Sequence, residues 1–137
     1  MNEIKSIKMI LCQLIIHYKG EQSDFDYFSD HIQEPETDYS LLYQTSVLYE
    51  QYVFSNLIIQ SGKYKINEDK SFVKEIVSCI ISSNSNVVMH YIGDGLILNE
   101  EDLINILKFY EPLEPSEYEQ ELYLYFRHLY SLMRIKK

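Results

Sequence analysis

Apolar residues recur at the spacing of an α-helix along most of this chain, and that pattern limits the fold more than any other feature of the sequence. Near the N-terminus, the residues that share one helical stripe are Ile4, Ile7, Leu11, Leu14, Ile15 and Tyr18. Gly20 follows this stripe and is expected to end the helix. The longest periodic segment begins at Thr37 or Asp38 and predicts one continuous helix over about residues 38–61.

The segments on either side of this long stretch also have helical signals. Ser23 and Asp26 have the spacing of a capping box, which predicts a short helix over residues 24–33. Residues 63–70, KYKINEDK, are polar and predict a loop. Apolar residues then return at helical spacing over residues 72–81, before a run of serine and asparagine predicts a turn.

The C-terminal third contains the clearest helix starts. Asn99 is placed as the N-cap of a helix that runs to about Tyr110, with Asp102 at the matching position of the first turn. Pro115 begins the last predicted helix, with Glu119 at its capping-box position. Its predicted apolar stripe contains Tyr118, Leu122, Tyr125, Leu129 and Leu132.

The stretch VVMHYIGDGLIL, residues 87–98, has two interpretations. Its β-branched and aromatic residues surround a Gly-Asp-Gly turn, which is typical of a small β-hairpin. Alternatively, Asn86 caps a two-turn helix that Gly93 closes. The fold class that we predict is therefore mainly α: one globular domain over residues 1–137, a bundle of about five or six helices, with room for one hairpin near residues 87–98.

The charges of the chain point to a basic partner. Twenty-one acidic and twelve basic residues leave a net charge of −9, which opposes binding to nucleic acid or to an anionic membrane. From Gly20 to Gly62 there is no lysine or arginine, while the acids of that span are Glu21, Asp24, Asp26, Asp30, Glu34, Glu36, Asp38 and Glu50. We expect one strongly negative side that attracts a cationic protein.

No motif singles out a catalytic residue, a cofactor site or a metal site. The four histidines lie on separate segments, and no C-x-x-C or H-x-x-x-H pattern occurs. Asp24, Asp26 and Asp30 have calcium-loop spacing, but Pro35 stands where that loop needs glutamate. We therefore expect a protein that is not an enzyme and carries no cofactor or metal.

Cellular location is inferred from the cysteines and from the apolar runs. Cys12 and Cys79 both have apolar neighbours, which predicts buried free thiols. The apolar run near the N-terminus is short and is interrupted by Gln13, and no small-residue cleavage site follows it, which is unlike a signal sequence. No apolar run approaches the roughly 20 residues of a membrane span. We expect a cytoplasmic protein.

Thirteen tyrosines are present, and several are concentrated on the last predicted helix. Tyr123, Arg127, Tyr130 and Arg134 share a face distinct from the apolar stripe, whereas Tyr118 and Tyr125 are expected in the core. Tyrosine and arginine are common among residues that dominate protein interfaces. The other interpretation is that these rings cover a second side of a buried helix, or reflect an AT-rich gene.

The hypothesis that follows is a protein-binding inhibitor of a basic partner. In its small size, acidity and lack of a catalytic motif, the chain is similar to the immunity proteins that bacteria make against toxic nucleases, and to small phage inhibitors of bacterial defence. The alternatives are a small enzyme whose site is assembled only in three dimensions, or an adaptor subunit, monomeric or homodimeric. The predicted partner-binding residues are Asp24, Asp26, Tyr27, Asp30, Glu34, Glu36, Asp38 and Tyr39, with Tyr123 and Tyr130 as a second patch.

Overall fold

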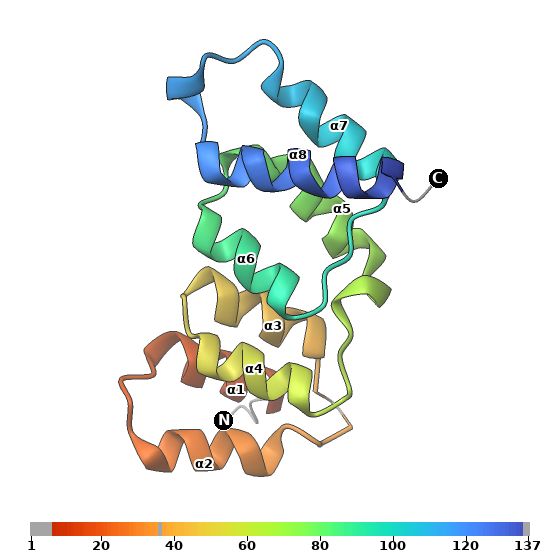
Figure 1. Cartoon of the computed structure of the whole chain (residues 1–137). Helices are drawn as coiled ribbons and strands as arrows, with labels where there is room; N and C mark the ends of the chain where they lie inside the picture. Colours follow the sequence, from red (N-terminus) through yellow and green to blue (C-terminus); the bar gives the residue numbers. More distant parts are fainter. Residues whose placement is uncertain (1–6, 36, 136–137) are drawn as a thin grey trace. The chain divides into compact units, whose positions relative to one another are not determined.

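The computed structural model describes residues 7–35 and 37–135, and these form eight α-helices, three short 3-10 helices and no strand (Figure 1). The prediction of a mainly α fold is confirmed. The expected count of five or six helices is wrong, and so is the hairpin. The chain divides into two compact units, residues 1–65 and 66–137, which we call the N-terminal and C-terminal units and describe separately. A single domain over the whole chain stays a prediction.

The N-terminal unit consists of four helices around an aromatic core. They are α1 (Ile7–His17), α2 (Gln22–His31), α3 (Tyr39–Leu48) and α4 (Tyr52–Gln60). Helix α3 packs against α4 and α1, and α1 packs against α2. Phe54 of α4 is fully buried, and the rings of Tyr18 and Phe28 lie with their centroids 4.7 Å from its own. This ring cluster joins α2 and α4, which are distant in sequence, to the end of α1.

The predicted long helix over residues 38–61 is instead two helices. The break lies at Glu50, whose φ of 55° is in the left-handed region, and neither glycine nor proline marks it in the sequence. The Gln51 backbone N–H donates to the Ser46 carbonyl at 2.7 Å, and the Gln51 side chain donates to the Tyr18 carbonyl at 3.0 Å. The turn lets α4 fold back against α3, and Leu42 and Val47 of α3 are buried together with Phe54 and Ile58 of α4.

The starts of α2 and α3 test the predicted caps. Helix α2 begins at Gln22, and its N-cap residue Glu21 makes no side-chain capping bond, so the predicted capping box is wrong. The Asp26 carboxylate instead accepts a hydrogen bond from the Gln22 side chain at 2.9 Å. Asp38 does cap α3, because its carboxylate accepts from the Leu41 N–H at 3.1 Å.

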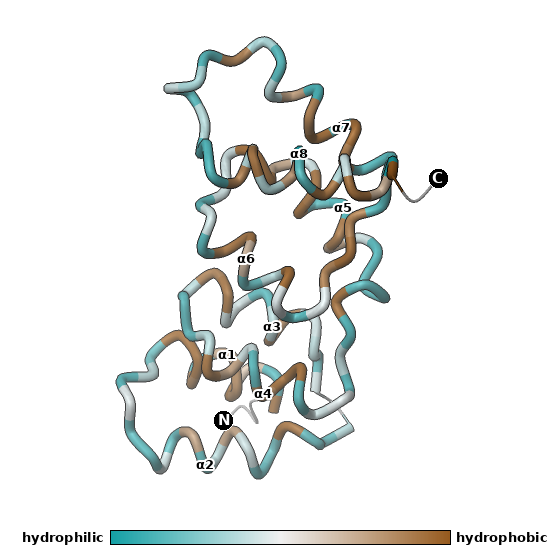
Figure 2. The backbone as a smooth tube through the Cα atoms, viewed as in Figure 1, coloured by the Kyte–Doolittle hydropathy of each residue, from teal (hydrophilic) through white to brown (hydrophobic). Residues whose placement is uncertain are grey.

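The C-terminal unit has four longer helices and three 3-10 turns. The helices are α5 (Lys70–Cys79), α6 (Ser85–Gly93), α7 (Glu100–Tyr110) and α8 (Gln120–Ile135), and the 3-10 turns are Ile66–Glu68, Ile80–Ser82 and Pro115–Glu117. Helix α7 packs against both α8 and α5. Leu103, Ile106 and Phe126 are fully buried in its core. Figure 2 shows the alternation of hydrophobic and hydrophilic residues along these helices that the sequence predicted.

Helix α6 bears out the helical one of the two interpretations of residues 87–98, and the hairpin is wrong. The N-cap of α6 is Asn84, whose side chain accepts from the Val87 N–H at 3.0 Å, two residues before the predicted cap at Asn86. The segment after α6 has no strand partner. The side chain of Asn67 takes that role, since it donates to the Gly95 carbonyl and accepts from the Ile97 N–H at 2.9 Å. One asparagine therefore satisfies the backbone groups that a second strand would have paired.

The two last predicted helices are confirmed with changes at their ends. Asn99 caps α7, with its side chain accepting from the Asp102 N–H at 2.7 Å, as predicted. Helix α8 begins at Gln120, and the capping box lies earlier, between Glu114 and Glu117 around the 3-10 turn. The predicted stripe is partly wrong. Phe126, which it omitted, is fully buried, while Leu132 is exposed, because α8 buries the face centred on Leu122 and Phe126.

Both cysteines are free, as predicted, but they are not both buried. Cys12 is partly buried, and burial is the main cause that raises the pKa of its thiol. Cys79 is exposed, because it is the last residue of α5 and Ile80 takes the buried position in the 3-10 turn that follows. None of the helices in the described ranges has the length and apolar character needed to cross a bilayer.

The left-handed backbone at Glu50 can be tested by substitution. Glu50→Gly should raise the free energy of unfolding by about 1 kcal/mol, because glycine adopts this conformation without the steric cost of a β-carbon. Glu50→Gln is the matched control, since it removes the same charge but keeps the β-carbon, and should stay within about 0.5 kcal/mol of wild type. Urea denaturation gives both values. Equal stabilisation by the two variants would assign the effect to charge rather than to backbone conformation.

Candidate functional site

The outward face of α2 contains three of the ten predicted partner-binding residues. Asp26, Tyr27 and Asp30 are exposed there, while Phe28 on the opposite side is fully buried. Asp24 is partly buried in the first turn, where a carboxylate is favoured by the helix dipole. The helix contains no lysine or arginine. Asp24 lies one turn before Phe28 and is therefore on the other side of the helix from Asp26 and Asp30. We call Asp26, Tyr27 and Asp30 the acidic face of α2.

Tyr27 is held in place by its neighbours along the helix. Its ring centroid lies 4.2 Å from that of His31, one turn further on, and the two planes are inclined by 36°. The Nδ1 atom of His31 contacts the Glu34 carboxylate just beyond the end of α2. Glu34 is therefore engaged with His31, and the row of Tyr27, His31 and Glu34 gives the acidic face one ordered aromatic ring.

Three other predicted partner-binding residues, Glu36, Asp38 and Tyr39, are not on the acidic face of α2. Asp38 uses its carboxylate to cap α3. The Tyr39 hydroxyl donates to the Ile32 carbonyl at 2.8 Å, and burial raises the pKa of this tyrosine. Both residues thus support the connection between α2 and α3. Glu36 lies outside the described residues.

The second predicted patch lies on α8, in the other unit. Arg127 donates to the Tyr123 hydroxyl at 3.0 Å, and Arg134 donates to the Tyr130 hydroxyl at 3.1 Å, each pair one turn apart. Each guanidinium also lies against the ring of its tyrosine, at 5.8 and 5.7 Å from the ring centroid. The hydrogen bond to Tyr130 is the main cause that raises the pKa of Arg134. Both rings are partly buried, so this patch presents arginine more than tyrosine.

Tyr123 belongs to a cluster of three tyrosines that joins α7 to α8. The ring centroids of Tyr110, Tyr118 and Tyr123 lie 4.9 to 5.1 Å from one another. Tyr110 is buried, and its hydroxyl has no hydrogen-bond partner within the part of the chain that the structure describes. Burial, followed by the nearby Tyr118 and Glu119, raises the pKa of Tyr110 to about 12. Tyr118, expected in the core, is only partly buried.

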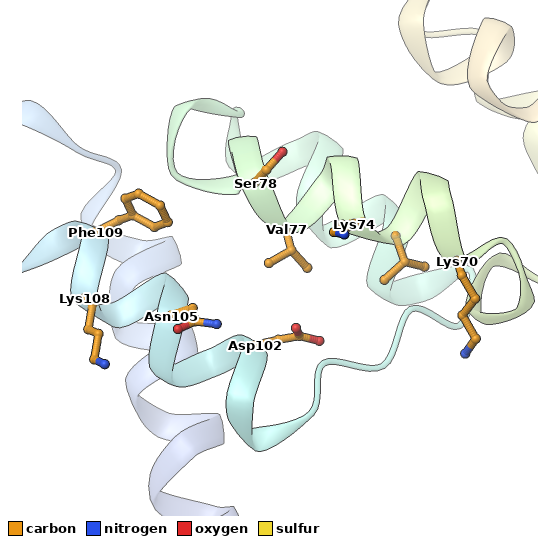
Figure 3. Close-up of a pocket in the computed structure, with 9 residues that line it drawn as sticks. Lys70, Lys74, Val77, Ser78, Asp102, Asn105, Lys108 and Phe109 are labelled. Carbon is orange, nitrogen blue, oxygen red and sulfur yellow. The ribbon is translucent and has the colours of Figure 1, made fainter.

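A groove between α5 and α7 is the feature that sequence reasoning missed (Figure 3). It has a volume of about 680 Å³. Val73, Val77 and Phe109 provide its apolar surface, and the polar or charged residues that line it are Lys70, Lys74, Ser78, Asp102, Asn105 and Lys108. The sequence held one signal: Lys70 and Lys74 repeat at the same four-residue spacing as Val73 and Val77.

The histidines do not form a metal site in the described residues. His90 Nε2 lies 3.0 Å from the Asp94 carboxylate, one turn along at the end of α6. His17 contacts Gln13 at 3.1 Å. Over residues 7–35 and 37–135, no group of three or more His, Cys, Asp or Glu side chains is arranged to hold a metal ion.

No known protein family, curated protein or solved structure gives a significant match to this chain.

The buried hydroxyl of Tyr110 gives a pH-dependent prediction. Between about pH 10 and pH 12, the unfolded chain has released this proton while the folded protein keeps it, so stability falls as the pH rises. Tyr110→Phe should lack this loss and become more stable relative to wild type across that window. Urea denaturation at several pH values measures the difference, with the exposed-ring variant Tyr49→Phe as the control for losing a tyrosine. A difference that does not change with pH would contradict the assigned burial of the hydroxyl.

Proposed function

We propose that this protein binds a basic partner protein and inhibits it, with the acidic face of α2 as the recognition surface. The partner class that we favour is a toxic nuclease, whose nucleic-acid site is cationic, so that the protein acts as an immunity protein in a bacterial cytoplasm. The observation that carries the proposal is the exposure of Asp26, Tyr27 and Asp30 side by side on a helix without lysine or arginine.

The charges of this surface are available to a partner. No basic side chain of the described residues forms an ion pair with Asp24, Asp26 or Asp30, since the two ion pairs found there involve Glu34 and Asp94. A cluster of unneutralised carboxylates raises the rate of encounter with a cationic protein and disfavours anionic competitors. Its carboxylates carry the same sign of charge as the phosphates that a nuclease must attract.

Tyr27 supplies the buried contact area that the charged side chains do not. A tyrosine ring buries a large area on binding and loses little conformational entropy, which is why tyrosine is enriched at the centre of interfaces. The ring already lies against His31 before any partner binds. This contact reduces the ordering cost of association. We therefore expect the Tyr27 ring to contribute most of the binding energy. The carboxylates orient the partner and raise the rate of association.

The test compares two variants with the same change in net charge. Asp26→Lys with Asp30→Lys reverses the acidic face, whereas Glu68→Lys with Glu111→Lys changes two exposed acids of the C-terminal unit. Asp24 is left unchanged because it stabilises the first turn of α2. Tagged protein is used to recover the partner from the native cell at low salt, and affinity is then measured with the purified partner by calorimetry.

We expect wild type and the control variant to recover the same basic protein. The reversed variant should bind it about 100-fold more weakly, in line with the coupling energies of close interfacial charge pairs. Binding should also weaken steeply between about 0.1 M and about 1 M salt, as the screening length falls from about 10 Å to about 3 Å. Recovery of no basic protein by wild type contradicts the function, and equal binding by the reversed variant contradicts only the assigned surface.

A further inference from the structure

We propose that the groove between α5 and α7 binds a small amphiphilic anion, a ligand with an apolar body and a carboxylate head. This site belongs to the C-terminal unit and is independent of the acidic face of α2. Its volume of about 680 Å³ lies within the range of sites that hold small organic ligands, about 300 to 1,000 Å³. Both walls are helices of the same unit, which pack directly on one another.

The apolar surface of the groove is what a ligand body would cover. Val73 and Val77 lie one turn apart on α5 and are only partly buried. Phe109 on α7 is 50% exposed, although it is one of the largest apolar side chains of the unit. Figure 3 shows Val77 pointing from α5 towards α7, with Phe109 at one end of the groove. Covering these groups with a hydrocarbon body removes apolar area from water, which is the main favourable term for such a ligand.

The charge of the groove selects an anion. Lys70, Lys74 and Lys108 line it, which is three of the seven basic residues between residues 66 and 137, a segment that contains twelve acids. None of these three ammonium groups is ion-paired with a carboxylate of the described residues. Lys70 and Lys74 lie one turn apart on α5, and like charges at that spacing repel each other. An anionic head between them relieves this repulsion.

Asp102 and Asn105 form part of the α7 wall of the groove, which faces the lysines of α5. Both are on α7 and face the groove in Figure 3, and Asp102 is its only carboxylate. In Figure 3, Asp102 lies nearer to the Lys70 end of the groove than Asn105 does, so its carboxylate opposes an anionic head that contacts Lys70 and Lys74. In Figure 3, Lys70 and Phe109 lie at opposite ends of the groove. Two lysines of α5 stand against this one carboxylate, so the head lies towards Lys70 and Lys74 and the apolar body along Val77 towards Phe109.

The experiment uses the full chain and three probes with the same alkyl chain but different heads. Decanoate is the anion, decanol the neutral analogue and decyltrimethylammonium the cation, all below their micelle concentrations. Binding is measured by calorimetry and located by shifts of the backbone amide signals in NMR spectra. We expect decanoate to bind most tightly and to shift the amides of Val77, Asn105 and Phe109. Tighter binding of the cation, expected from the net charge of −9 alone, would overturn the proposal.

Substitutions test which charged side chains contribute to decanoate binding. Lys70→Gln with Lys74→Gln should weaken decanoate binding about tenfold, because two partly solvated charge contacts are lost. Lys63→Gln with Lys65→Gln is the matched control: it removes two exposed lysines of the preceding connector and should leave the affinity unchanged. Asp102→Asn should tighten binding several-fold, since it removes the one negative charge of the groove. Circular dichroism checks that each variant is folded.

Three results would overturn the site. They are no decanoate binding at about 1 mM, amide shifts confined to residues outside α5 and α7, and equal loss of affinity in the two lysine pairs. The Asp102→Asn variant keeps the size of the side chain and leaves the capping bond from Asn99 to the backbone in place. Unchanged or weaker decanoate binding by this variant would contradict the proposed position of the head.

Discussion

Most helices that the structure describes are short, and the fold depends on burying one face of each against a neighbour. Seven of the eight α-helices have nine to eleven residues, a length at which an isolated helix is barely stable in water. Their stability must therefore come from packing, such as the cluster of rings around Phe54 and the burial of Leu103, Ile106 and Phe126. The turn at Glu50 follows from the same need, because a folded-back α4 covers α3.

This dependence on packing divides the polar residues into two groups. Asp38, Asn84 and Asn99 satisfy backbone N–H groups at the starts of helices, and Asn67 satisfies the backbone of an extended segment. These side chains hold the short helices in place. Asp26 and Asp30 do not contribute to the fold in this way, since they lie on the exposed side of α2. A surface whose charges are not required by the fold is the one on which we place a partner.

The two proposed sites differ in the kind of ligand that their shape and charge favour. The acidic face of α2 is a convex helix surface with one ordered ring, which suits a large cationic surface. The groove of α5 and α7 is concave, has apolar walls and is lined by lysine, which suits a small anion. They lie in separate units of the chain. A role for the groove in regulating partner binding would require coupling between units and does not follow from either site alone.

The sequence by itself determined the mainly α class, the cap at Asn99 and the concentration of acids on α2. These features are local, because a helical period, a capping side chain and a run of like charge depend on residues that are neighbours in the chain. Residues 87–98 show the limit of such reasoning. Their composition left a hairpin and a short helix both open, and the structure has the helix, which Asn84 caps, followed by a segment that Asn67 holds at Gly95 and Ile97.

Only the tertiary structure decided where the long apolar segment turns, which lysines line a groove and which tyrosines are covered. Glu50 has no conformational signal of its own, because its left-handed backbone is imposed by the packing of α4 on α3. Lys70, Lys74 and Lys108 come together only because α5 and α7 lie side by side. Phe126 is buried and Leu132 is exposed, contrary to the predicted stripe, for the same reason. The helices that pack against α8, and not its own period, select which of its apolar residues are buried.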